Sequence, residues 1–581
     1  MSLRFRKVRP QKISLIGRFI GGIEETRPSD RVLLRVLFFG LIASILWAGI
    51  SFNNTLIAET PALGGTLIEG IVGTPRFVNP ALAVTRADLD MSALVYSGLM
   101  KINPEGELIP DLAENVTLSD DGKTYNILLR KNIRFHDGTP FTARDVTFTI
   151  GLIQNADLKS PLRGNWSGIT VDEINEYELN INLEEAYTPF IENFTVGILP
   201  RHIWNEIPME QITFNERNTN PIGTGPFAIK KIIRDESNVI TSYQLEKFSE
   251  NTTVKLSEIT VRFFTNEPSL VDALLDGSVM SSAGVSMERV QELVDHGYTV
   301  HEEALPRVFA IFFNQNRSPA LRDTAVRLAL AAATPREDLV LTALSGYGVP
   351  MNTPVPNLSH AVESFGQASV TAATTSPAIT EAITILSKGG WVKNNTGVWE
   401  KRINGEVEKL SLTLRTANTP VFEKTTEIIA RSWRELGVEV EVEQFEQSDL
   451  LQAVIRPRDF EALLFGLDMN RAVDLYPFWH SSQREDPGLN IAQYANIEVD
   501  RLLTNARVAT TTVARDASIL AATNIMNREV PAIFLYVPSM VYISDSQLIT
   551  TPITDISRPS ERFMNVASWH INTDRLWPIF R

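Results

Sequence analysis

One short stretch places an imidazole beside a carboxylate, the pairing that general acid–base catalysis uses. It reads Phe135-His136-Asp137-Gly138. Asp-Gly is also typical of a turn, and Thr142 with Asp145 has the spacing of a helix cap. We therefore predict that His136 is structural and bonds to a loop.

Other candidate motifs for chemistry lack a required residue. His301-Glu302-Glu303 begins like a zinc-protease helix, but Leu305 stands where the second histidine belongs. Gly223-Thr224-Gly225-Pro226 lacks the third glycine of a dinucleotide-binding turn, so we interpret it as a lobe-linking loop. No G-x-S-x-G sequence occurs, and the absence of cysteine excludes thiol nucleophiles, thiolate metal ligands and disulfides. We predict no enzyme activity, no catalytic residue, no metal and no cofactor.

Charge is distributed unevenly along the chain. The first 35 residues contain nine Lys and Arg and three Asp and Glu, a net charge of +6, whereas the whole chain of 581 residues has a formal net charge of −15. The remainder of the chain therefore has a net charge of −21. Such an acidic body repels phosphate backbones, which argues against binding to nucleic acid.

The amino-terminal basic region precedes a long apolar stretch. Residues 32–52 contain one charge, Arg35, and about 20 apolar residues suffice to span a bilayer. We predict a basic cytoplasmic tail at 1–31, a single-pass transmembrane anchor at 32–52 and a tether at 53–63, with the body outside the cell membrane. A cleaved signal peptide and a buried soluble helix are the alternatives.

The rest of the chain alternates strands and helices. Residues 116–118 and 124–129 flank an Asp-Gly turn and predict a hairpin. Ser318-Pro319 starts a predicted helix. Thr419-Pro420 starts another, which Gly437 ends before the alternating strand at 438–443. This pattern predicts an α/β fold in which helices cover a sheet.

Several stretches occur in the order found in one known family. They are Gly64–Leu67, Asn79-Pro80, Val95–Leu99, Ser119–Tyr125, Leu129–Lys131, Ile133–Val146, Pro200–His202, Gly223–Phe227, Phe313-Asn314, Pro319–Leu339 and Trp479–Ser482. The set resembles the extracellular solute-binding proteins of family 5, which serve ABC importers of peptides, nickel complexes and related solutes.

The resemblance implies a two-lobed periplasmic-binding-protein-like fold of type II, a clamshell, with an extra subdomain on lobe I. Lobe I would comprise 64–312, with the subdomain at about 80–220, lobe II would comprise 313–530, and 531–581 would return to lobe I. A solute would be enclosed as the lobes close on a hinge.

The resemblance also implies where the solute binds. The segment 465–476 would run along the cleft wall, and Asn470 stands where peptide-binding members have a carboxylate for the ligand's α-amine. Asp468 and Asp474 are nearby substitutes, or else merely cap turns. The predicted ligand-binding residues are Phe77, Tyr96, Asn314, Gly466, Asp468, Asn470, Asp474, Tyr476, Trp479 and Tyr536.

These features together predict the substrate-binding component of an ABC importer. We expect a monomer that binds a peptide or similar small molecule and delivers it to a permease and ATPase complex. A membrane-tethered solute sensor and a tethered peptidase are the alternative functions.

Overall fold

The computed structural model describes residues 27–56, 58–250, 253–355, 375–469, 471, 473–509, 511–551 and 554–576. The chain forms two compact units. The first comprises 1–62 with 572–581, and the second comprises 63–571.

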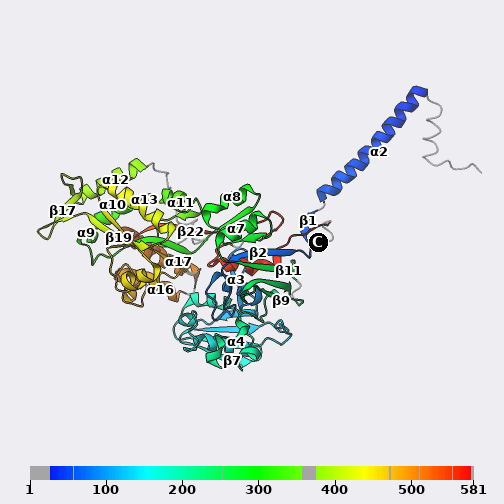
Figure 1. The fold of residues 1–581 in the computed structure, drawn as a ribbon, viewed down its shortest axis with the longest axis horizontal. Coiled ribbons are helices and arrows are strands. Elements are labelled where there is room, and N and C mark those ends of the chain that lie inside the picture. The colour runs from blue at the N-terminus through cyan, green and yellow to red at the C-terminus, as the bar shows by residue number, and fades with distance from the viewer. Residues whose placement is uncertain are drawn as a thin grey trace, which may run out of the picture. The chain divides into compact units, whose positions relative to one another are not determined.

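The first unit contains one long helix and one pair of strands. The helix α2 spans Pro28–Leu56 (Figure 1), and β1 (Ala58–Pro61) pairs antiparallel with β23 (Thr573–Leu576). Residues 32–52 are thus helical. Crossing a bilayer needs about 20 predominantly apolar residues. Within the described residues no helix is long and apolar enough to cross a membrane, so the predicted anchor is not supported.

A twelve-stranded sheet runs through the second unit. Its central path follows the order β20-β19-β21-β14-β22-β12-β2-β11-β10-β9, and β13 and β15 also pair with β22. The strands are β2 (Thr66–Val72), β9 (Phe227–Arg234), β10 (Ile240–Lys247), β11 (Glu258–Phe264), β12 (Ser281–Ser282), β13 (Thr299–Ala304), β14 (Arg307–Phe313), β15 (Gly348–Pro350), β19 (Ser411–Ala417), β20 (Glu439–Phe445), β21 (Ala462–Asp468) and β22 (Ala532–Ser544).

The strand β22 belongs to both halves of this sheet. Its residues 539–544 pair with β13, whereas its residues 532–536 pair with β14. The pairing therefore changes at 305–306 and at 537–538. Below, lobe I denotes residues 63–306 with 538–571, and lobe II denotes residues 307–537. The borders predicted from the resemblance stay predictions.

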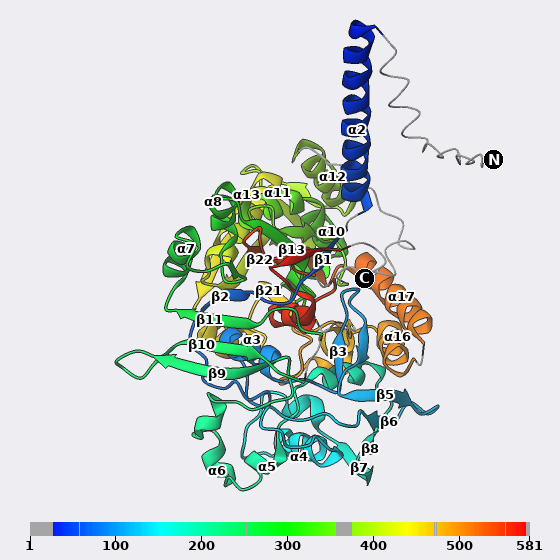
Figure 2. The same cartoon turned by 90° about the vertical axis from the view of Figure 1, so that its right-hand side faces the viewer.

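Lobe I adds a small sheet to its half of the large one (Figure 2). This sheet has the order β5-β6-β8-β7, and the hairpin predicted around the Asp-Gly turn is confirmed as its β5–β6 pair. The elements of lobe I outside the large sheet are β3 (Met100–Ile102), β4 (Leu108–Pro110), β5 (Ala113–Leu118), β6 (Thr124–Leu129), β7 (Ile169–Asn175), β8 (Glu178–Leu183), α3 (Arg86–Val95), α4 (Ala143–Gln154), α5 (Arg201–Trp204), α6 (Met209–Ile212), α7 (Glu267–Leu275), α8 (Val290–Asp295), η1 (Arg163–Trp166), η2 (Thr188–Thr195), η3 (Glu216–Asn218), η4 (Met287–Arg289) and η7 (Pro559–Ser568).

Lobe II packs helices against its half of the large sheet. The predicted unit of helix, glycine and strand is confirmed: Thr419 caps α13, Gly437 ends it with a φ of 104°, and β20 follows. The remaining elements are α9 (Pro319–Arg322), α10 (Thr324–Ala332), α11 (Arg336–Ala343), α12 (Thr375–Lys388), α13 (Pro420–Leu436), α14 (Gln447–Asp449), η5 (Leu450–Ile455), α15 (Tyr476–Trp479), η6 (Ser481–Gln483), α16 (Ile497–Val508), α17 (Thr512–Glu529) and a small sheet of β16 (Val392–Lys393), β17 (Trp399–Ile403) and β18 (Glu406–Lys409).

One predicted helix is interrupted. The helix expected from Pro319 ends at Arg322, and a second one begins at Thr324. Asp323 lies between them with an extended backbone and accepts a hydrogen bond from the Ala325 amide at 2.9 Å. Lys401 pairs with the same carboxylate at 2.7 Å. The cap itself is local, but the sequence pattern gave no sign of the Lys401 contact, because that lysine comes from a distant hairpin.

Candidate solute-binding site

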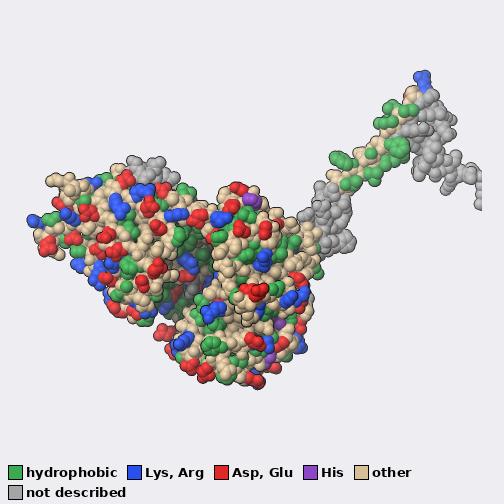
Figure 3. All heavy atoms as spheres, viewed as in Figure 1, with side chains coloured by type: hydrophobic (Ala, Val, Ile, Leu, Met, Phe, Trp, Pro, Cys, Tyr) green, Lys and Arg blue, Asp and Glu red, His purple; other side chains and the backbone are tan. Residues whose placement is uncertain are grey.

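A cavity of about 270 Å³ opens on lobe I and is bordered by one loop of lobe II. Figure 3 shows the surface hollowed between the two lobes. The walls of the cavity come from α3 and the turn after it, β3, η2, η7 and Arg471. Pockets of about 300–1,000 Å³ hold typical small ligands, so this cavity suits a small solute or one end of a longer one.

The helix α3 fixes one wall of the cavity. Thr85 and Asp88 form the capping box at its start, and Asp88 also accepts hydrogen bonds at 2.7 Å from the amides of Arg76 and Phe77. The turn after the helix passes close to η2. A Cβ on Gly98 would lie 2.6 Å from the carbonyl oxygen of Phe194, so only glycine fits there.

The opposite wall carries a buried ion pair that joins the lobes. Arg471 of lobe II donates to Glu561 of η7 at 2.6 Å, and it also donates to the carbonyl oxygen of Asp555. The side chains of Arg471 and Glu561 are 13% and 11% exposed. Burial raises the pKa of the Glu561 carboxyl, although Arg471, the Ser557 amide and Arg558 oppose that rise. The contact requires the two lobes to be in proximity, so it stabilises a closed arrangement.

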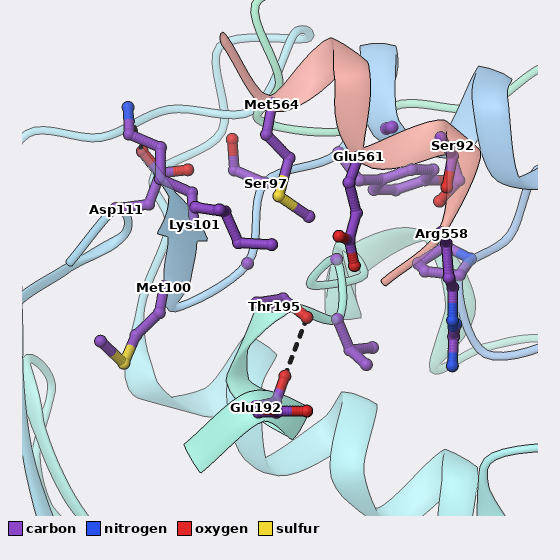
Figure 4. A pocket seen from close by; sticks show the side chains of 18 of the residues that line it. Ser92, Ser97, Met100, Lys101, Asp111, Glu192, Thr195, Arg558, Glu561 and Met564 are labelled. Carbon is purple, nitrogen blue, oxygen red and sulfur yellow. Dashed lines mark hydrogen bonds and ion pairs between the residues drawn. The ribbon is translucent and has the colours of Figure 1, made fainter. Parts of the chain in front are cut away.

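A second ion pair lies across the cavity. Lys101 of β3 and Asp111 are 3.4 Å apart, with side chains 38% and 26% exposed. Figure 4 shows this pair on one side of the cavity, Glu561 and Arg558 on the other, and Glu192 below. Charged groups of both signs therefore face the same space.

Of the residues predicted to bind the ligand, Tyr96 lines this cavity. It is 5% exposed, and its hydroxyl has no hydrogen-bond partner among the described residues. Burial raises the pKa of that hydroxyl. Asn470 lies outside the described residues.

The other predicted residues lie elsewhere, and their contact with a ligand stays a prediction. Phe77 packs against the lobe I core beside Arg76, and Asp468 pairs with Arg307 at 2.8 Å. The remaining side chains are engaged in lobe II. Asn314 donates to Arg458, Gly466 faces the ring of Phe309, Tyr476 stacks on His480, Trp479 is fully buried and Tyr536 bonds Thr425.

Asp474 belongs to a second polar contact between the lobes. Its carboxylate accepts hydrogen bonds from Arg507 at 2.6 Å and from the Tyr187 hydroxyl of lobe I at 3.2 Å. The guanidinium of Arg507 lies 5.2 Å from the ring centre of Tyr187. Beside it, Thr188 donates to the carbonyl oxygen of Ala509 at 2.8 Å. We call these five residues the Tyr187 clasp.

Replacing Asp474 by alanine is expected to weaken solute binding about 10-fold, because a charge-assisted contact between the lobes is lost. Titration calorimetry with a cationic and a neutral solute would distinguish two causes. An equal loss of affinity for both solutes would indicate that Asp474 acts through the Tyr187 clasp. A loss confined to the cationic solute would mean that Asp474 contacts the ligand directly, and no loss for either would contradict both roles.

The motif around His136 is structural, as predicted. The ring lies between two backbone groups of the glycine loop: its Nε2 is 3.0 Å from the carbonyl oxygen of Gly225, and the Gly223 amide donates to its Nδ1 at 3.4 Å. Asp145 caps α4. The loop was predicted to link the lobes, and this prediction is wrong: it joins η3 to β9 inside lobe I and packs on α3, where the Gly225 amide donates to Val95.

The buried position of His136 predicts a loss of stability in acid. Burial lowers the pKa of the imidazole, so below about pH 6.5 the unfolded chain binds more protons than the folded one. The stability is therefore full above that pH and falls as the pH drops toward the lowered folded-state pKa. Comparing unfolding free energies at pH 7.5 and 5 should show a smaller acid loss in His136→Gln than in the native protein. His296→Gln, at an exposed histidine, should keep the native acid loss; an unchanged loss in His136→Gln would refute the assignment.

Comparison with known proteins identifies the family. The pattern of the bacterial extracellular solute-binding proteins, family 5, matches residues 107–486. The chain belongs to this family. The chain is also similar to the oligopeptide-binding protein AppA of Bacillus subtilis, with 27% identity over 510 residues, or 83% of this chain and 88% of AppA.

Solved structures of other solute-binding proteins share the fold. CtaP of Listeria monocytogenes has a TM-score of 0.71 at 22% identity, covering 88% of this chain and 99% of CtaP. NikZ of Campylobacter jejuni, solved with Ni(L-His), has a TM-score of 0.63 at 22% identity, covering 87% of this chain and 99% of NikZ. The predicted two-lobed α/β fold and the family resemblance are thereby confirmed.

Sequence reasoning missed the charged side chains that face the cavity. Lys101, Asp111, Glu192, Arg558 and Glu561 lie in stretches without a functional motif. Arg471 lies in the segment 465–476 that the resemblance pointed to, directly after the position compared with the ligand-binding carboxylate. That adjacency was the one available signal.

Proposed function

We propose that this chain works outside the cytoplasm, where it captures a peptide or a similar solute in the cavity that lobe I and Arg471 of lobe II line. It then delivers the solute, chemically unaltered, to an ABC permease. The observation that carries the proposal is the cavity itself, lined by lobe I and bordered by Arg471 of lobe II in a member of family 5. Relatives are named as oligopeptide-binding and D,D-dipeptide-binding proteins, which supports a peptide-like solute.

The arrangement suits capture rather than catalysis. Two ion pairs border the cavity, Arg471–Glu561 between the lobes and Lys101–Asp111 within lobe I, and the imidazole of His136 is bonded to backbone. Closing the lobes on a solute removes both from water and strengthens their polar contacts. Opening the lobes breaks the Arg471 contact and lets the solute leave.

Mass spectrometry of solutes released from the purified full chain tests the proposal. Denaturing the protein should release about one equivalent of a small molecule, and that molecule should rebind to refolded protein without a change in mass. If screening with peptides and other small solutes gives no binding, or if the solute is converted into products, the proposal fails.

A further inference from the structure

The charges that face the cavity balance, and they are not all paired with one another. Three cations, Lys101, Arg471 and Arg558, and three carboxylates, Asp111, Glu192 and Glu561, line it. A cavity with no net charge disfavours a solute of strong single charge and accommodates one that carries both signs, because buried charges need partners.

Arg558 is the cation of this set that remains available. Lys101 is paired with Asp111, and Arg471 with Glu561. Arg558 is exposed, and its side chain makes no hydrogen bond or ion pair within 4.0 Å among the residues that the structure describes.

The carboxylate of Glu561, which lies near Arg558 in the chain, does not neutralise that cation. Glu561 follows it by three residues and feels its charge, but the Glu561 oxygen Oε2 already accepts from Arg471 and from the Ser557 amide, each at 2.6 Å. Two guanidiniums therefore lie near one carboxylate, which is bonded to that of Arg471 alone. This side of the cavity keeps about one positive charge, ready for an anionic group of a bound solute.

We propose that Arg558 determines specificity by binding the carboxylate of a short zwitterionic solute, such as a tripeptide with a free carboxyl terminus. This inference rests on the proposed function. A guanidinium presents two parallel N–H donors that match a carboxylate, and charge-assisted bonds of this kind are about twice as strong as neutral ones. The cavity of about 270 Å³ limits the part of the solute that it can enclose.

Titration calorimetry of the full chain with trialanine and with trialanine amide tests the inference. The two peptides differ at the carboxyl terminus alone. The native protein should bind the free acid about 10- to 100-fold more tightly than the amide, as the loss of a charge-assisted hydrogen bond implies. Arg558→Ala should bind both with the weaker affinity, whereas Arg501→Ala, at an exposed arginine of α16, should keep the native preference. Circular dichroism checks that the variants are folded.

Each contrary result has a distinct meaning. Equal affinity of the native protein for the two peptides, or a preference that survives in Arg558→Ala, would overturn the role of Arg558 and leave the proposed function standing. Binding of longer peptides without binding of trialanine would overturn the short-solute inference in the same way. Failure to bind a peptide of any length or another small solute would remove the proposed function, and this inference with it.

Discussion

Replacing Arg562 by methionine is expected to lower the free energy of unfolding by about 3–5 kcal/mol, because two buried carboxylates would lose their partner. Arg562 lies 2.7 Å from Glu69 and 2.7 Å from Asp90, and all three side chains are 5% exposed or less. They join β2, α3 and η7. Tyr542 of β22 also donates to Glu69, at 3.1 Å.

Chemical denaturation of the full chain measures this loss. The matched control is Arg431→Met, which removes an arginine whose side chain is 72% exposed and pairs along α13 with Glu427. Surface ion pairs of that kind contribute little to stability, so the control should have a free energy of unfolding close to that of the native protein. An Arg562→Met protein as stable as the control would show that the carboxylates find other partners or protons.

Filling the cavity is expected to abolish solute binding. Ala93 lies on α3 and lines the cavity, so tryptophan in its place would occupy space that the solute needs. We expect at least about a 100-fold loss of affinity, because a well-packed site cannot admit both groups without strain. Calorimetry with the solute released from the native protein measures this change.

The control for this variant adds the same side chain elsewhere. Ile174 is 54% exposed on β7 and is not among the residues that line the cavity, so Ile174→Trp should bind the solute as the native protein does. Native-like binding by Ala93→Trp would show that the solute binds outside this cavity.

Local sequence patterns predicted the parts of the fold that local physics decides. The β5–β6 hairpin follows from an Asp-Gly turn, and the end of α13 follows from Gly437, whose φ of 104° few other residues adopt. Residues 32–52 are helical, but the transmembrane anchor predicted there is not supported by the described residues.

The candidate site depends on contacts that no local pattern encodes. Arg471 meets Glu561 across 90 residues, and Arg562 meets Asp90 across 472. Asp474 seemed suited to a cationic ligand from its position in the chain. In the fold, however, Arg507, 33 residues away, pairs with it. Which charges remain for a solute is thus set by tertiary pairing.

The cavity should hold one solute and return it intact, and native mass spectrometry tests this most directly. The full chain would be incubated with trialanine and measured at once and after several hours. We expect a complex of one protein with one peptide, a peptide of unchanged mass at both times, and no complex with Ala93→Trp. Cleaved peptide, or an equal complex with Ala93→Trp, would contradict the account.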